Sequence, residues 1–234
     1  MSRAGTSEVI FTVDGACRGA RAVLPIVPGA VAFGVVYGFL AGERGLTALE
    51  IALTSMLVFA GASQFLALEM WQQPLPVLAL VLGVLVINLR HFLMGPALLP
   101  WLARIPPSQA YASLYFMTDE SWGVSVVEER RGGRDAAFLL GAGLTLYAVW
   151  LTSTVLGRSV GDLSYLIHDW GLEYLTTAFF VALLAGFWRG SGDLLPWLVA
   201  GGASLLSKWL LPGTWYIVLG ALAGSAVGAW RTAR

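Results

Sequence analysis

Two groups of polar residues interrupt otherwise apolar segments of the chain. Asn88, Arg90 and His91 form one group, and Asp119 and Glu120 form the other. A charged side chain inside a membrane span is costly and usually faces a partner group or an interior cavity, so these residues are functional candidates. Asn88 and His91 are three residues apart and share a helix face, whereas Arg90 points away from it. We expect Arg90 to form an ion pair with Asp119 or Glu120.

Such a pair offers chemistry as well as structure. A carboxylate in apolar surroundings can bind and release a proton, as in membrane proton relays, so Asp119 and Glu120 are the predicted proton-coupling residues. Two alternatives stay open. The pair could be purely structural, or the Arg90 side chain could extend along its own helix to the membrane surface.

Small residues and hydrogen-bonding groups occur together in the segment 59–65, whose sequence is FAGASQF. Gly61 and its small neighbours allow a local bend, while Ser63 and Gln64 offer polar groups to a solute. The alternative use of such side chains is an ordinary hydrogen bond between helices. The substrate-binding residues predicted from these motifs are Gly61, Ser63, Gln64, Asn88, Arg90 and His91.

The segment 24–29, with the sequence LPIVPG, contains Pro25, Pro28 and Gly29. Proline removes a backbone donor and blocks the helical ladder. Irregular backbone at membrane depth persists only where it is buried in protein or lines a cavity. This pattern predicts a broken first helix with Pro28 and Gly29 at the substrate site. The alternative is an ordinary helix start with proline in its first turn.

The composition is that of a protein dissolved in lipid. Hydrophobic residues make up 57% of the 234 residues and charged residues 12%, with a mean hydropathy of +0.74. A soluble domain carries about 25% charged residues, so this chain cannot cover a water-facing surface. The net charge of zero argues against nucleic acid as a partner.

Metal sites, cofactors and covalent cross-links find no support in the sequence. The single cysteine, Cys17, excludes an intrachain disulfide and a cysteine metal cluster. His168 lies in a polar loop without ligand spacing, and we expect that loop to be solvated. No nucleotide-binding P-loop pattern is present. The first twenty residues contain charges and no long apolar run, so we expect no cleavable signal peptide.

The apolar segments predict an all-α, polytopic transmembrane helix bundle of about seven to eight spans, because about 20 apolar residues cross a bilayer. We expect one membrane domain over 1–234, with 1–20 as its cytoplasmic N-terminal segment. The seven clear segments are 22–41, 48–70, 76–99, 136–157, 172–188, 194–211 and 213–230.

An eighth segment, 110–127, is apolar except for its two carboxylates, and it decides the topology. If it spans, the basic residues of the N-terminus, the 128–135 loop and the C-terminus share one side, and Arg44, Arg104 and Arg158 lie on the other. This positive-inside bias favours eight spans with both termini cytoplasmic. The alternative is a re-entrant segment, which would move the 128–135 loop to the other side and remove the bias.

Glycines recur every fourth residue in the first and last spans, as Gly34, Gly38 and Gly42 and as Gly220, Gly224 and Gly228. This spacing forms a stripe on which a neighbouring backbone can approach closely. We expect tight packing inside the bundle, with a subunit interface as the alternative.

Four blocks in order carry a resemblance to a known family. They are 28–34 (PGAVAFG), 59–65 (FAGASQF), 88–91 (NLRH) and 118–120 (TDE). Together they resemble the AzlC family of branched-chain amino acid permeases, over roughly residues 18–230. The first block has VAFG where the family usually has a proline before Phe-Gly.

The resemblance implies export of valine, leucine or isoleucine across a bacterial inner membrane, powered by the proton gradient. It also implies a separately encoded small membrane partner of the AzlD type. Arg90 could then bind the substrate carboxylate, and Asp119, Glu120 or Gln64 its ammonium group. An aliphatic side chain would lie against Phe33, Phe59, Phe65 or Phe116.

Three other functions remain open. A channel would need a continuous polar path. An intramembrane enzyme would need nucleophile or zinc motifs, and neither H-E-x-x-H nor G-x-S-x-G is present. An assembly subunit would lack its own substrate site. Saturable flux against a gradient, activity on a lipid or peptide, and binding to the isolated chain would separate these possibilities.

Overall fold

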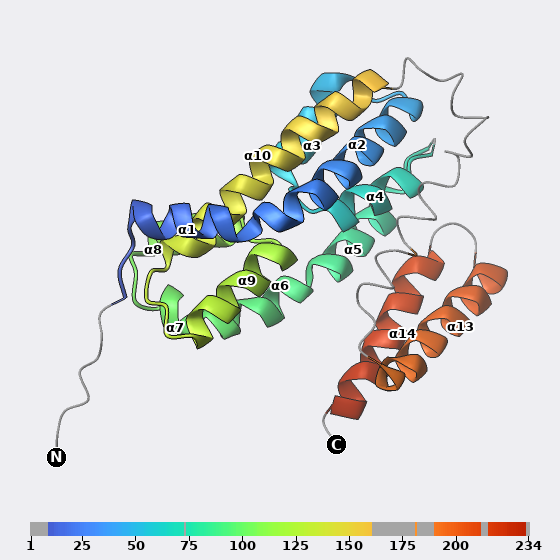
Figure 1. Cartoon of the computed structure of the whole chain (residues 1–234). Helices are drawn as coiled ribbons and strands as arrows, with labels where there is room; N and C mark the ends of the chain where they lie inside the picture. Colours follow the sequence, from blue (N-terminus) through green and yellow to red (C-terminus); the bar gives the residue numbers. More distant parts are fainter. Residues whose placement is uncertain (1–8, 73, 161–180, 182–189, 212–214, 233–234) are drawn as a thin grey trace. The chain divides into compact units, whose positions relative to one another are not determined.

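The computed structural model describes residues 9–72, 74–160, 181, 190–211 and 215–232 (Figure 1). These residues are mostly helical, and they include no strand beyond an isolated bridge between Ile10 and Asp135. Three helical stretches within them are long and apolar enough to cross a membrane, namely Val13–Glu43, Val77–Leu102 and Ala137–Ser159. The predicted all-α membrane bundle is confirmed. The expected span at 172–188 and the His168 loop lie outside the described residues.

The chain divides into two compact units that alternate along the sequence. The first consists of residues 1–60 and 90–161, and the second of residues 61–89 and 162–234. Two of the boundaries fall inside motifs, at Ala60–Gly61 within FAGASQF and at Leu89–Arg90 within NLRH.

The first unit begins with a kinked helix. It consists of α1 (Val13–Val23), a 3₁₀ turn (Leu24–Ile26) and α2 (Val27–Glu43). Pro25 lies in the 3₁₀ turn and Pro28 in the first turn of α2, where a missing N–H leaves no bond unmade. The predicted break is therefore a kink, and the helical stretch already begins at Val13, within the segment 1–20 that was expected to be cytoplasmic.

Helix α10 (Ala137–Val160) packs along α1 and α2 and runs in the same direction (Figure 1). A Cβ on Gly19 would lie 1.9 Å from the Phe138 carbonyl oxygen, and one on Gly38 would lie 1.8 Å from that of Thr154. Real Cβ atoms do not approach so closely, so both positions require glycine. Gly34 and Gly42 also face α10, at Ser153 and Arg158. The first glycine stripe serves helix packing, as expected.

A buried carboxylate joins the N-terminal ends of α1 and α10. Asp135 is 3% exposed and accepts hydrogen bonds from the backbone N–H of Thr12 (3.1 Å), from the Thr12 hydroxyl and from the N–H of Ala137 (3.1 Å). The backbone of Ile10 pairs with Arg134 and Ala136 beside it. These bonds fix the two helices at one level, which we call the N-terminal end of the unit.

Helix α3 (Ala48–Leu57) begins at the opposite end of the unit. Thr47 and Glu50 form a capping box at its start, and the guanidinium of Arg158 donates to the Leu46 carbonyl (3.2 Å). Ser55 and Thr154 share a buried hydrogen bond of 2.9 Å. The helix then stops, and Phe59 adopts φ +40°. A non-glycine residue in this region stores about 1–3 kcal/mol of strain.

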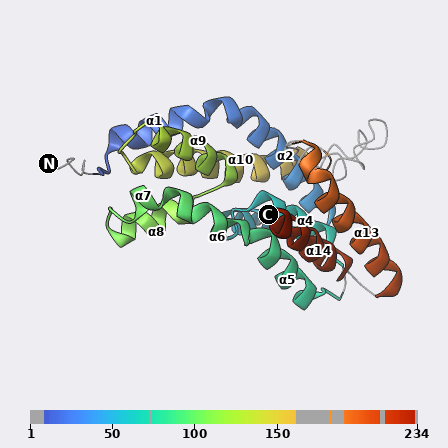
Figure 2. The same ribbon diagram turned by 90° about the horizontal axis from the view of Figure 1, so that it is seen from below.

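The segment 90–130 contains four short helices and a 3₁₀ turn. They are α6 (Arg90–Met94), the 3₁₀ turn (Gly95–Leu98), α7 (Leu99–Leu102), α8 (Pro107–Tyr115) and α9 (Asp119–Arg130). Figure 2 shows α9 beside α1 and α10.

Contacts with the rest of the unit show that the chain reverses direction between α8 and α9. Trp101, before α8, packs on Phe138 at the N-terminal end. Phe116, between α8 and α9, lies near the middle of α10, where a Cβ on Gly143 would be 2.2 Å from its carbonyl oxygen. Glu128, near the end of α9, pairs with Arg18 at the N-terminal end again (2.7 Å). We call residues 107–130 the hairpin and residues 115–118 its tip.

The hairpin differs from the expected uninterrupted span at 110–127. The apolar length is as expected, but the chain enters and leaves at the same end of the unit. Arg104 consequently lies at the end that carries the 128–135 loop, and the eight-span prediction had placed it on the other side. The segment enters and leaves at one end, as in the re-entrant alternative, but that end also carries Arg18, so the 128–135 loop does not move away from the N-terminal end as that alternative expected.

The second unit contains α4 (Gly61–Glu69), α5 (Val77–Asn88), a 3₁₀ turn (Ser191–Asp193), α13 (Leu194–Leu210) and α14 (Trp215–Thr232). Leu66, Met70 and Ala79 form a small core between α4 and α5. Gly220 and Gly224 face Ser204 and Ala200 of α13, so these members of the second glycine stripe also serve packing.

Candidate functional site

Arg90 and Asp119 form an ion pair in the first unit, between guanidinium Nη1 and carboxylate Oδ2. Arg90 is the first residue of α6, and Asp119 is the first residue of α9. Their side chains are 29% and 30% exposed. The pair is therefore neither sealed in the core nor fully accessible, and a small ligand could contact either charge.

Local sequence explains why α9 begins at Asp119. The hydroxyl of Thr118 accepts from the Ser121 N–H (3.3 Å), and the hydroxyl of Ser121 accepts from the Thr118 N–H (2.8 Å). These reciprocal bonds satisfy donors that a helix start leaves unpaired. Asp119 and Glu120 then occupy the first turn, where the helix dipole favours negative charge.

Two tryptophans hold α9 and its C-terminal loop against the segment that carries Arg90. The Trp122 indole N–H donates to the Met94 carbonyl (2.9 Å), and the Trp101 indole N–H donates to the Gly133 carbonyl (2.9 Å). These bonds set the register in which Arg90 meets Asp119.

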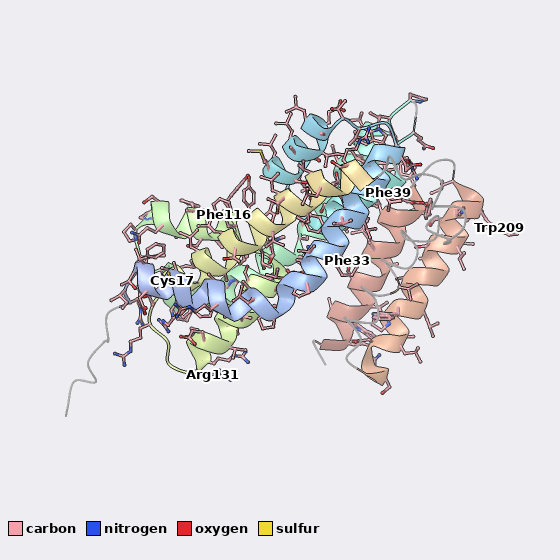
Figure 3. All side chains as sticks on the ribbon, turned by 45° about the horizontal axis from the view of Figure 1, so that its top comes forward. Cys17, Phe33, Phe39, Phe116, Arg131 and Trp209 are labelled. Carbon is pink, nitrogen blue, oxygen red and sulfur yellow. The ribbon has the colours of Figure 1, made fainter. Side chains whose placement is uncertain are left out.

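The hairpin tip meets the end of α3 at an aromatic cluster. The rings of Phe59 and Phe116 each lie 5.0 Å from the ring of Tyr147, both edge to face. The hydroxyls of Tyr115 and Tyr147 donate to the Met56 carbonyl at 2.7 and 3.3 Å. Figure 3 labels Phe116 at this position, between Cys17 and Phe39 near opposite ends of the unit.

Sequence comparison gives the site its context. Residues 25–163 match a family model described as AzlC protein, which covers more than half of the chain. The chain belongs to the AzlC family. The match includes Arg90, Asp119 and the aromatic cluster.

Three relatives align with this AzlC-family chain over most of their lengths. An archaeal protein of Archaeoglobus fulgidus, named "Uncharacterized membrane protein", is 32% identical over 88% of this chain and 90% of its own. The Bacillus subtilis "Branched-chain amino acid transport protein AzlC" is 26% identical over 86% and 78%. The Escherichia coli "Inner membrane protein YgaZ" is 25% identical over 83% and 82%. No solved structure matches the chain significantly.

The remaining predicted residues of the AzlC chain fall into three groups. His91 and Glu120 join Arg90 as charged or titratable neighbours of Asp119. Pro28 and Gly29 are exposed in the first turn of α2, with no described atom within 4 Å of a Cβ on Gly29, so the described residues place nothing against them.

The third group lies in the second unit. Gly61 begins α4, Ser63 and Gln64 are 1% and 3% exposed, and Asn88 ends α5. The Ser63 hydroxyl has no hydrogen-bond partner among the described residues. Convergence of these groups with Arg90 and Asp119 stays a prediction, because each unit is described by itself.

Residue types alone did not single out Tyr115, Tyr147 or Met56. Tyrosines are common in membrane proteins, and a methionine carbonyl has no sequence signal. Their role follows from three chain segments that meet at one point, which pattern reading along the chain cannot detect.

Proposed function

We propose that the chain is the large subunit of a secondary exporter for branched-chain amino acids such as valine, leucine and isoleucine. The observation that carries the proposal is the partly exposed Arg90–Asp119 pair at two helix starts within an apolar bundle. Charged residues of this kind mark substrate or ion pathways in membrane proteins. The printed name of the Bacillus subtilis relative supports the substrate class.

A zwitterionic amino acid complements the two charges. The planar guanidinium of Arg90 can bind a carboxylate through two hydrogen bonds. Asp119 can accept hydrogen bonds from an ammonium group. A substrate that inserts between them would replace one ion pair by two, so neither charge would be left uncompensated. The rings of Phe116 and Phe59 would then accept the aliphatic side chain.

Proton coupling follows from the same pair. A proton on Asp119 removes the negative charge that the substrate ammonium group needs, so the proton and the substrate compete for the site. A site that holds one or the other exchanges them across the membrane, and inward proton movement would drive amino acid export, with Glu120 as the neighbouring carboxylate.

We further propose an inner-membrane location with a cytoplasmic N-terminus, and a small membrane partner of the AzlD type. The orientation is supported by basic residues at the N-terminal end of the first unit, against Arg44 and Arg158 at the other. Those N-terminal-end residues are Arg18, Arg104, Arg130, Arg131 and Arg134. Positive charge is enriched on the cytoplasmic side of membrane proteins. The partner is an expectation from the family resemblance.

Efflux of labelled leucine from right-side-out vesicles, or its uptake into inverted vesicles, tests the proposal. We expect saturable, pH-dependent leucine export that requires this chain and increases when the partner is co-expressed. Linear, non-saturable flux would instead favour a channel. Activity of the purified chain on a lipid or peptide would favour an enzyme. Absence of amino acid binding by the isolated chain, with transport by the partner alone, would favour an assembly role.

A further inference from the structure

We propose that Tyr147 is a positioning residue that fixes the hairpin tip and thereby sets Asp119 against Arg90. This inference rests on the proposed function for its effect on transport. Its geometric basis is that two interrupted helical segments contact the Tyr147 ring. The ring centroids of Phe59 and Phe116 each lie 5.0 Å from the Tyr147 ring centroid. Tyr147 lies on α10, which packs along the kinked first helix and contacts both interrupted segments.

The hydroxyl of Tyr147 binds a carbonyl that the helix break releases. In an uninterrupted helix the Met56 carbonyl would accept from the N–H of residue 60, but α3 ends at Leu57. Tyr147 and Tyr115 donate to this oxygen instead. One carbonyl thus joins the end of α3, the end of α8 and the middle of α10.

The backbone of the tip has little room to move. The Phe116 carbonyl lies against Gly143, where even a methyl group would clash at 2.2 Å. Met117 is 3% exposed and belongs to the main core of the unit. Because packed interiors have little free space, a displacement of one tip residue must move its neighbours along the chain as well.

The hairpin tip lies close to the Asp119 carboxylate along the chain. Phe116 and Asp119 are three residues apart, so their Cα atoms lie within about 11 Å of each other. Thr118 between them is fixed by its bonds to Ser121. A shift of Phe116 on the Tyr147 ring would therefore move the carboxylate relative to Arg90. The cluster positions the ion pair without contacting it.

The first test compares Tyr147→Leu with Tyr147→Phe in leucine efflux. We expect Tyr147→Leu, which removes both edge-to-face contacts, to raise KM about tenfold and to leave Vmax per inserted molecule within about twofold. Tyr147→Phe keeps the ring, and Tyr115 still occupies the Met56 carbonyl, so we expect less than a threefold change. Tyr111→Leu is the control, because Tyr111 lies on the same hairpin and is 72% exposed.

The second test does not depend on transport. In a Cys17→Ser background, a cysteine at position 117 (Met117→Cys) should react slowly with N-ethylmaleimide. Tyr147→Leu should accelerate that reaction about tenfold if the lost contacts release the tip, whereas Tyr111→Leu should not.

These outcomes separate the two proposals. Faster labelling in a chain that exports no amino acid would support the positioning role of Tyr147 and contradict the proposed function. If Tyr147→Leu leaves both labelling and KM unchanged in a chain that exports leucine, the positioning role of Tyr147 alone is overturned. If Tyr147→Leu fails to insert, Tyr147→Met replaces it. That variant keeps a long apolar side chain but also removes the ring, so unchanged labelling in it would equally overturn the positioning role of Tyr147.

Discussion

The chemistry of this chain depends on one pair of charges at two helix starts. Arg90 and Asp119 are each about two-thirds covered, and the neighbouring Glu120 is exposed. Neutralising one member of a covered pair leaves the other uncompensated, which costs more than losing a surface pair. The two carboxylates should therefore differ in importance although they are adjacent.

Asp119→Asn should reduce export and abolish its pH dependence, because the amide cannot exchange a proton and leaves Arg90 without a counter-charge. We expect an efflux rate at least tenfold lower, a loss typical of one positioned charge or proton-transfer group. Glu120→Gln is the matched control and should retain most activity. Efflux across pH, normalised to inserted protein, checks both variants. Intact pH dependence in the two variants together would remove proton coupling from this site.

Residue types were sufficient to predict the Arg90–Asp119 pair, but the predicted reason was incomplete. The favoured eight-span topology put the two residues in two full spans, whereas the structure forms the pair with a segment that turns back. The aromatic cluster was not predictable, because Phe59, Phe116 and Tyr147 come from three distant segments. At Pro28 and Gly29 a strong local signal marks the start of α2, and their contact with substrate stays a prediction.

At the level of elements, close backbone contact between α2 and α10 holds the first unit together. Gly38→Ala would place a methyl group 1.8 Å from the Thr154 carbonyl oxygen and force the helices apart. Overpacking of this kind costs about 1–3 kcal/mol. Thermal unfolding in detergent should show a lower Tm. Gly29→Ala is the control, because a Cβ there meets open space among the described residues and should not lower Tm. Equal Tm values for Gly38→Ala and the unaltered chain would contradict the packing role.

Local sequence patterns predicted most helices, but they did not predict that the segment 110–127 turns back on itself instead of forming one span. Glycine spacing, proline positions and the FAGASQF motif each marked a contact or a break that the structure contains. Hydropathy has no means to distinguish a span from a hairpin of equal apolar length. That choice depends on where the segment meets the rest of the unit. Phe116 contacts Tyr147 in the middle of α10, and Glu128 pairs with Arg18 of α1 at the N-terminal end.

At the level of the whole molecule, the hairpin changes which loops share a side of the membrane. In the eight-span arrangement the loop before α8 lies opposite the N-terminus. In the structure that loop and the loop after α9 both lie at the N-terminal end of the first unit. Arg104 then joins Arg130, Arg131 and Arg134, which strengthens the charge difference between the two ends rather than abolishing it.

Accessibility to a membrane-impermeant maleimide distinguishes the two arrangements. Native Cys17 is exposed at the N-terminal end and is the only cysteine, so it reports that side directly. In a Cys17→Ser background, we expect Ser108→Cys to be labelled from the same side as Cys17, and Ala48→Cys from the opposite side. Ser108 and Ala48 are both exposed residues at helix starts, which makes them a matched pair. Labelling of Ser108→Cys from the Ala48→Cys side would show that 107–130 crosses the bilayer and that the hairpin does not form there.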